Sequence, residues 1–145
     1  MALYPIALKA NGRFAKVAMT ASVEKEFDGL GLAVRARLQA TIEAYAQDGP
    51  TYLSKAKFRK NEGRHSMKDG TGANALVAAF AHNEAGIRIY GSLQIFRGQK
   101  TFLCTEVDVN KKQRKANQEK LQRSAENIGR ILSDERKEQK EGGTR

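Results

Sequence analysis

The feature of this sequence that most restricts its fold is a stretch between residues 76 and 109 in which apolar and polar residues alternate. A period of two residues is typical of a β-strand with one buried face, whereas helices repeat every three to four residues. Short turns at Ala85-Gly86 and Arg97-Gly98-Gln99 divide the stretch. The predicted strands are Leu76–His82, Ile87–Phe96 and Thr101–Val109. Consecutive strands joined by such short turns run antiparallel, so we expect an antiparallel meander.

The residues before this stretch have the period of helices. Val34, Leu38, Ile42 and Tyr45 recur at helical spacing, and Asp48-Gly49-Pro50 ends the pattern. A shorter helix is expected in front of it, capped by Ser22 with acidic residues in its first turn and interrupted by Gly29 and Gly31. We therefore predict an antiparallel helical pair.

The two ends of the chain complete the expected architecture. Residues 1–20 suit a β-hairpin with a type I′ turn at Asn11-Gly12, because both residues tolerate positive φ. The polar stretch 61–74 is expected to be a loop. The apolar face of a C-terminal helix consists of Leu121, Ala125, Ile128 and Leu132. The order of strands, helices, strands and helix indicates an α+β fold, with the helical pair and the C-terminal helix packed on the antiparallel meander.

A chain of 145 residues is long enough for one hydrophobic core. We expect a single domain over residues 1–133, with the hairpin as an N-terminal addition, followed by a charged tail at 134–145 that is predicted to be disordered. No stretch approaches the roughly 18 apolar residues of a membrane span, and the N-terminus has no signal-peptide pattern. Cys104 is the only cysteine, which suits a reducing compartment. These features favour a cytoplasmic protein that does not bind membranes.

The formal net charge of +10 favours a polyanionic partner, with RNA as the first choice. Basic residues are concentrated in two segments, 51–70 and 110–123. The two segments form one patch if the chain between them folds back. The candidate RNA-binding residues in them are Lys57, Arg59, Lys60, Arg114 and Lys115.

The alternation in the second and third predicted strands places several chemically active groups on one face. Arg88 and Tyr90 alternate with apolar residues in the second strand, and Glu106 and Asp108 do so in the third. If the helices cover the apolar face, these four side chains lie on an open face of the sheet. An arginine there can neutralise a phosphodiester, and a carboxylate or a neutral lysine can take the proton of a ribose 2′-hydroxyl.

An alternative explains the same residues without chemistry. An arginine that faces carboxylates on a sheet more often forms a cross-strand ion pair on a solvated surface. His65 and His82 are isolated in the sequence, and with Cys104 they do not have the spacing of a metal site. The turn Asp69-Gly-Thr-Gly72 lacks the lysine of a phosphate-binding loop. We therefore predict no metal and no cofactor.

Three short segments in order resemble the RelE/HigB-like toxin superfamily, and its phage-derived HigB-type branch in particular. They are Gly86-Ile-Arg-Ile-Tyr-Gly91, the strand that follows it, and Asn110-Lys-Lys-Gln-Arg-Lys115 leading into a helix. The resemblance covers residues 58–132. It implies a compact α+β fold and a metal-independent endoribonuclease that acts on mRNA, in many members on the ribosome. It also implies a partner antitoxin, which for this chain is expected to be a small acidic protein.

The resemblance also implies roles for individual residues. Arg88 matches the strand arginine that contacts the scissile phosphate, and Lys111, Lys112 and Lys115 match the basic motif after the last strand. Tyr90 matches the tyrosine of the same strand, with a role in either stacking or structure. The predicted catalytic set is therefore Arg88, Lys111, Lys112, Glu106 and Asp108.

The sequence departs from the family pattern in two places. The strand before Arg88 has no ionisable residue until His82, and Ala116-Asn117 stands where family members have a proline. The general base is consequently open between Glu106, Asp108 and His82, in that order. A non-catalytic module of the same fold, binding RNA, the ribosome or a protein, is the alternative function.

Overall fold

The computed structural model describes residues 2–109 and 117–143, which form one mixed six-stranded sheet and three helices. The strands are β1 (Ala7–Asn11), β2 (Lys16–Met19), β3 (Phe58–Ser66), β4 (Asn74–His82), β5 (Ile87–Phe96) and β6 (Gln99–Asp108). The helices are α1 (Ala21–Asp28), α2 (Leu32–Asp48) and α3 (Gln118–Gly143). The predicted α+β class is confirmed.

The strand order across the sheet is β1-β2-β6-β5-β4-β3. The predicted meander is present, since β4, β5 and β6 pair antiparallel in sequence order. The sheet as a whole is mixed, because β2 runs parallel to β6 and carries the N-terminal hairpin into the same sheet. The hairpin is therefore an integral part of the sheet.

The predicted loop at 61–74 is wrong over its first part, because residues 58–66 form the edge strand β3. The pairing of β3 with β4 shifts register between Arg59 and Gly63. A bulge of this kind interrupts the two-residue alternation, and an edge strand carries polar side chains on its exposed side. Both effects hide the strand from its sequence pattern.

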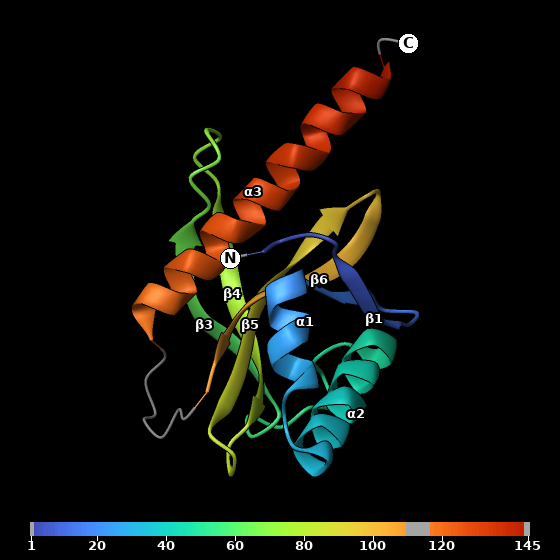
Figure 1. Ribbon diagram of the computed structural model, residues 1–145, viewed down its shortest axis with the longest axis vertical. Helices are drawn as coiled ribbons and strands as arrows, with labels where there is room; N and C mark the ends of the chain where they lie inside the picture. The colour runs from blue at the N-terminus through green and yellow to red at the C-terminus, as the bar shows by residue number, and fades with distance from the viewer. Residues whose placement is uncertain (1, 110–116, 144–145) are drawn as a thin grey trace.

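The helices cover both faces of the sheet (Figure 1), as the two separate core clusters show. Val23, Leu38 and Ile42 from α1 and α2 pack on one face, together with Ala78 and Phe80 of β4. The apolar side of α3 packs on the opposite face, where the neighbouring strand residues Ala75, Val77 and Ala79 point. Side chains alternate between the two faces of a strand, so these clusters lie on opposite sides of β4. The protein thus has three layers.

Aromatic rings fill the core beneath α2. The ring of Tyr45 lies 4.9 Å from that of Phe58 and 5.3 Å from those of Phe80 and Phe102, measured between centroids. Most of these pairs have the edge-to-face geometry that favours aromatic packing. The predicted apolar stripe of α2 is therefore anchored at Tyr45.

The turn of the N-terminal hairpin differs from the expected type I′, because neither Asn11 nor Gly12 has positive φ. Glycine is needed at position 12 for another reason. A Cβ added to Gly12 would lie 2.3 Å from the carbonyl oxygen of Ala46, near the end of α2. The absence of a side chain lets the hairpin turn pack directly on the helix backbone. The start of α1 also differs in detail, since Thr20 rather than Ser22 accepts the capping hydrogen bond from Val23 N.

The predicted disordered tail is wrong for residues 134–143, because α3 continues to Gly143 and projects beyond the sheet (Figure 1). Glu, Lys, Gln and Arg are good helix formers, so a charged composition does not by itself exclude a helix. The helix is also held from outside. Tyr4 Oη donates to Asp134, Arg97 N donates to Glu135, and Arg136 pairs with Asp69.

Candidate active site

The register of β5 and β6 brings the four predicted sheet residues together. Arg88 lies directly opposite Asp108, and Tyr90 lies opposite Glu106. Directly opposed residues of antiparallel strands share a face of the sheet. The predicted clustering of Arg88, Tyr90, Glu106 and Asp108 on one face is therefore confirmed.

The expectation that this face is open is wrong. Arg88, Glu106 and Asp108 are 5%, 6% and 8% exposed, and Tyr90 is completely buried. The cause is α3, whose apolar side needs a surface to cover. Because α1 and α2 occupy the first face, α3 packs on the second, on an apolar floor that includes Val77, Ala79 and Leu103.

Arg88 is held by an acidic residue that sequence reasoning missed. Its Nη1 lies 3.0 Å from Glu62 Oε1, and the same oxygen lies 2.9 Å from Nε of Arg59. The side chains of Glu62 and Arg88 are each only 7% exposed. The expected ion pair of Arg88 is present, but its partner comes from β3 instead of β6, and it is buried instead of lying on a solvated surface. The assignment of residues 61–74 to a loop concealed Glu62, and the only sequence signal for it was an acid among basic residues.

Glu106 is the carboxyl group best suited to proton transfer. Burial raises its pKa, and the charges of Arg123 and Lys120 only partly oppose this effect. Its Oε1 lies 3.8 Å from Nη2 of Arg123, and no group among the described residues donates a hydrogen bond to its buried Oε2. A cavity of about 20 Å³ adjoins it, lined in part by Val23 and Glu26 of α1. That volume holds roughly one water molecule. Burial and a raised pKa are typical of carboxyl groups that act as general bases or acids, which makes Glu106 the candidate for this role.

The surroundings of Asp108 and Tyr90 suit electrostatic and structural roles. Lys120 Nζ lies 3.7 Å from Asp108 Oδ1 and donates a hydrogen bond to the carbonyl of Val107. Burial, followed by the charge of Asp108, raises the pKa of Tyr90 to about 12, so the phenol stays neutral near pH 7. The buried ring has no free face on which a base can stack, which favours a structural role.

The basic residues predicted to act in catalysis or RNA binding, apart from Arg88, divide into three groups. Lys111, Lys112, Arg114 and Lys115 lie outside the described residues. Arg59 pairs with Glu62, as described above. Lys57 and Lys60 are exposed, and neither forms an ion pair within residues 2–109 and 117–143. These two remain accessible to a polyanion.

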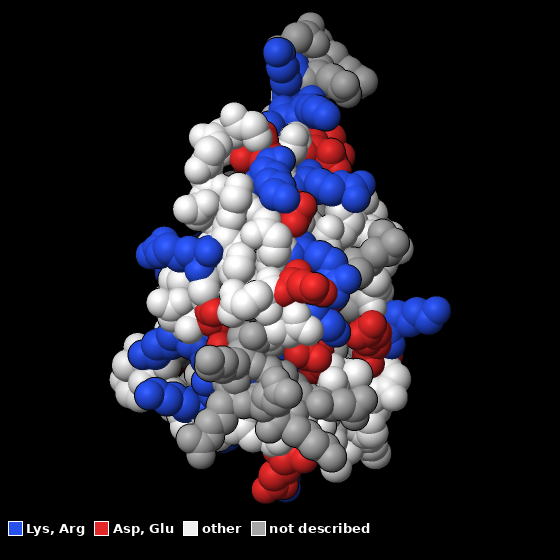
Figure 2. Space-filling model, turned by 90° about the vertical axis from the view of Figure 1, so that its left-hand side faces the viewer, with Lys and Arg blue, Asp and Glu red and all other residues white. Residues whose placement is uncertain are grey.

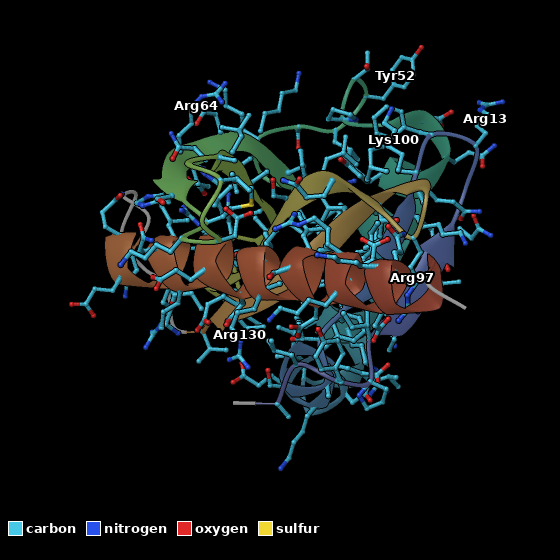
Figure 3. The ribbon with its side chains drawn as sticks, turned by 90° about the horizontal axis from the view of Figure 1, so that it is seen from above. Arg13, Tyr52, Arg64, Arg97, Lys100 and Arg130 are labelled. Atoms are coloured by element: carbon cyan, nitrogen blue, oxygen red, sulfur yellow. The ribbon has the colours of Figure 1, made fainter. Side chains whose placement is uncertain are left out.

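The described parts of the two segments touch at one place, because β3 and α3 lie side by side. Gln122 of α3 donates to the carbonyl of Ser66, and His65 Nδ1 lies 3.0 Å from Gln122 Oε1. Basic and acidic side chains are interspersed on this side of the molecule (Figure 2). Arg64 projects outward from β3, and Lys100 and Arg13 lie along the same side of the view in Figure 3. Exposed basic side chains therefore lie at several separate places on the described surface.

The remaining candidates lie apart from the cluster around Arg88. His82 pairs with Ile87 and faces away from Arg88, so the structure does not bring this candidate base to the site. Cys104 is completely buried, which raises the pKa of its thiol. No group of three or more potential metal ligands occurs within the described residues.

Comparisons of this chain with protein-family models, with curated proteins and with solved structures find no match. Among the described helices, none combines the length and the apolar character needed to cross a membrane.

Proposed function

We propose that this protein is a toxin-like endoribonuclease of RelE-like fold that cleaves mRNA in the cytoplasm, with Arg88 and Glu106 at its active site. The observation that carries the proposal is the pairing of β5 with β6, which gathers Arg88, Tyr90, Glu106 and Asp108 into one cluster. The resemblance of the Arg88 strand and of the following basic segment to the family supports it. The net charge of +10 supports an RNA substrate.

The proposed reaction uses the ribose itself as nucleophile. Glu106 takes the proton from the 2′-hydroxyl, whose oxygen attacks the adjacent phosphorus and forms a cyclic phosphate. Arg88 neutralises the charge that develops on the phosphate oxygens. Lys111 or Lys112 returns a proton to the departing 5′-oxygen. These steps need only the residues of the chain and the substrate.

Access to Arg88 requires a rearrangement. In the structure Glu62 forms an ion pair with the guanidinium group of Arg88, and α3 covers β5. A phosphodiester has to replace Glu62, while contacts elsewhere on the RNA compensate for the opening. A small acidic antitoxin fits the same scheme, because it would compete with RNA for the basic surface.

The second candidate is a non-catalytic module of the same fold that binds RNA, the ribosome or a protein. The burial of Arg88 in an ion pair favours it, since a guanidinium held in this way serves structure without any chemistry. Both candidates predict binding to RNA, and only the first predicts new RNA ends.

The test is induced expression of the wild type and of Arg88 variants, with growth followed and RNA ends mapped. Arg88→Ala leaves the buried Glu62 with Arg59 as its remaining partner, and a double variant, Arg88→Met with Glu62→Met, removes both charges of the Glu62–Arg88 pair together. We expect growth arrest and new mRNA ends for the wild type, and a loss of cleavage by roughly 100-fold or more for both variants.

Arg130→Ala is the matched control, because Arg130 is an exposed residue of α3 outside the cluster. It should arrest growth like the wild type. Undiminished cleavage by the folded double variant would contradict the assignment of Arg88. RNA binding without new ends in the wild type would establish the second candidate.

A further inference from the structure

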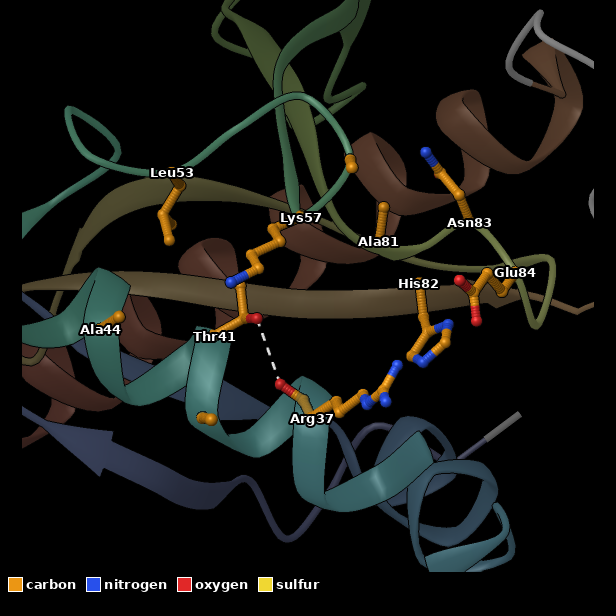
Figure 4. Close-up of a pocket in the computed structure, with 11 residues that line it drawn as sticks. Arg37, Thr41, Ala44, Leu53, Lys57, Ala81, His82, Asn83 and Glu84 are labelled. Carbon is orange, nitrogen blue, oxygen red and sulfur yellow. Dashed lines mark hydrogen bonds between the residues drawn. The ribbon is translucent and has the colours of Figure 1, made fainter. Parts of the chain in front are cut away.

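A groove lies on the side of the sheet opposite Arg88, between α2 and the neighbouring ends of β3 and β4 (Figure 4). Its volume is about 610 Å³, within the range of roughly 300–1,000 Å³ typical of small-molecule sites. It is lined by Arg37, Ala40, Thr41, Ala44, Leu53, Ala56, Lys57, Ala81, His82, Asn83 and Glu84. The proposed nuclease mechanism uses none of these residues.

Two unpaired cations stand at this groove. Arg37 comes from α2 and Lys57 from the segment that leads into β3, and both side chains project into the groove in Figure 4. Neither forms an ion pair with any residue that the structure describes. The backbone of Lys57 is fixed, because its carbonyl accepts a hydrogen bond from Ala81 N at 2.8 Å. Arg37 and Lys57 therefore border one groove from separate elements, with the guanidinium beside His82 and the ammonium above Thr41 (Figure 4).

His82 adds a hydrogen-bond donor whose position on the ring is fixed. Its Nδ1 accepts a hydrogen bond of 3.3 Å from Ala85 N, so in the neutral ring Nε2 carries the hydrogen. The ring lies at the groove beside Arg37 (Figure 4). Arg37, Lys57 and His82 thus offer a guanidinium, an ammonium and an N–H group, a combination that suits phosphate oxygens.

The rest of the lining is mostly apolar and has no bulky side chain near Arg37. Ala40 and Ala44 stand one helical turn apart on α2, and Leu53 lies across from them. A flat ring fits against such a wall, since it meets methyl groups instead of long side chains. Asn83 and Glu84 at the end of β4 provide an amide and a carboxylate, which can bind the hydroxyls of a sugar.

We infer that this groove binds a nucleoside phosphate, with its phosphate held by Arg37, Lys57 and His82 and its base against Ala40, Ala44 and Leu53. The ligand is either a free nucleotide or one unit of an RNA strand, which share this chemistry. The site goes beyond the proposed nuclease activity, because it lies on the other face of the sheet and needs no reaction at Arg88.

The experiment is a titration of isotope-labelled full-length protein, followed by the amide signals of His82, Asn83 and Glu84. The probes are the four nucleoside 5′-monophosphates, inorganic phosphate and a short single-stranded RNA. The test variant is Arg37→Gln with Lys57→Gln. The control is Lys25→Gln with Lys137→Gln, which changes the net charge equally at residues that do not line the groove.

We expect at least one nucleotide to shift these signals in the wild type and in the control. The test variant should bind about tenfold more weakly or worse, because it loses two charge-assisted contacts. A tighter response to RNA than to the mononucleotide assigns the site to an RNA strand, and an equal response assigns it to a free nucleotide.

Three results would overturn the inference. They are no shift with any nucleotide at millimolar concentration, equal weakening in the two double variants, and an identical response to inorganic phosphate alone. Growth arrest by Arg88 variants is measured separately, so failure here leaves the proposed nuclease untouched.

Discussion

Glu62 and Arg88 determine what the candidate active site can do at the scale of single residues. Both side chains are almost fully buried, and breaking a buried pair costs about 3–5 kcal/mol where it leaves an uncompensated charge. Arg59 also pairs with Glu62, so it lowers this cost on the carboxylate side. A phosphodiester suits a guanidinium about as well as a carboxylate does, so replacing Glu62 gains little by itself. The free energy that opens the site must come from contacts elsewhere on the RNA. Binding and cleavage are therefore coupled in the proposed function.

Glu106 allows a test of its buried state through pH. Burial raises the pKa of Glu106 in the folded protein above its value in the unfolded chain. At pH values between these two pKa values, the folded state binds more protons than the unfolded state. The free energy of unfolding therefore falls as the pH rises through this interval. We predict that the wild type loses stability relative to Glu106→Gln from about pH 4.3 upward, until the raised pKa is passed.

Urea unfolding of both proteins across this pH range measures the difference. Below about pH 4 the two should be nearly equally stable, because a protonated carboxyl and an amide are both neutral. A difference that stays constant or grows in favour of the wild type with rising pH would contradict the assigned environment of Glu106.

The alternation of apolar and polar residues was enough to place Arg88, Tyr90, Glu106 and Asp108 on one face. It was not enough to show what covers that face. Whether that face is exposed depends on the position of α3. The sequence does not give this position, because a single helix with one apolar stripe can pack on either side of a sheet. The partner Glu62 was equally hidden, because its strand is bulged and polar.

At the scale of elements, a bulge in β6 interrupts the alternation of side chains between the two faces of the sheet. Tyr90 pairs with Glu106 and Gly91 with Cys104, which leaves Thr105 without a partner across the pair. The extra residue reverses the alternation, so Leu103 packs beneath α3 whereas Val107 packs on the other side. The same bulge directs Thr105 to Ser124 of α3, with an oxygen–oxygen distance of 2.7 Å. The strand thereby bonds directly to the covering helix.

The contact of α3 with the end of β3 depends on a glycine. A Cβ added to Gly129 would lie 2.3 Å from the carbonyl oxygen of Met67, closer than real Cβ contacts. We predict that Gly129→Ala destabilises the protein by about 1–3 kcal/mol through overpacking. The sign of the change in stability is informative, because replacing glycine by alanine in an unobstructed helix would instead stabilise the helix by about 1 kcal/mol.

Thermal or urea unfolding of Gly129→Ala measures this cost. Arg130→Ala is the neighbouring control, and its stability should stay within about 0.5 kcal/mol of the wild type. A Gly129→Ala protein as stable as the wild type would show that α3 does not lie this close to Met67.

At the scale of the whole molecule, the excess of positive charge is only partly neutralised inside the structure. Glu62, Glu106 and Asp108 each have a basic neighbour, so the candidate active site does not account for the net charge of +10. The accessible cations lie elsewhere, and Lys60 and Arg64 on the edge strand β3 are among them. In the proposed function, RNA binds mainly through its phosphates, with an affinity set by the salt concentration.

The salt dependence of RNA binding therefore tests whether the edge strand is part of the RNA-binding surface. Each phosphate contact to a single strand contributes about 0.7 to the slope of log K against log salt. If Lys60 and Arg64 each contact one phosphate, Lys60→Gln with Arg64→Gln lowers the slope by about 1.4. Lys25→Gln with Lys137→Gln has the same net charge and should keep the wild-type slope. Equal slopes in the two double variants would place RNA on another surface, because a general effect of net charge acts on both variants alike. The measurement needs only binding, so it applies whether or not the protein cleaves the RNA that it holds.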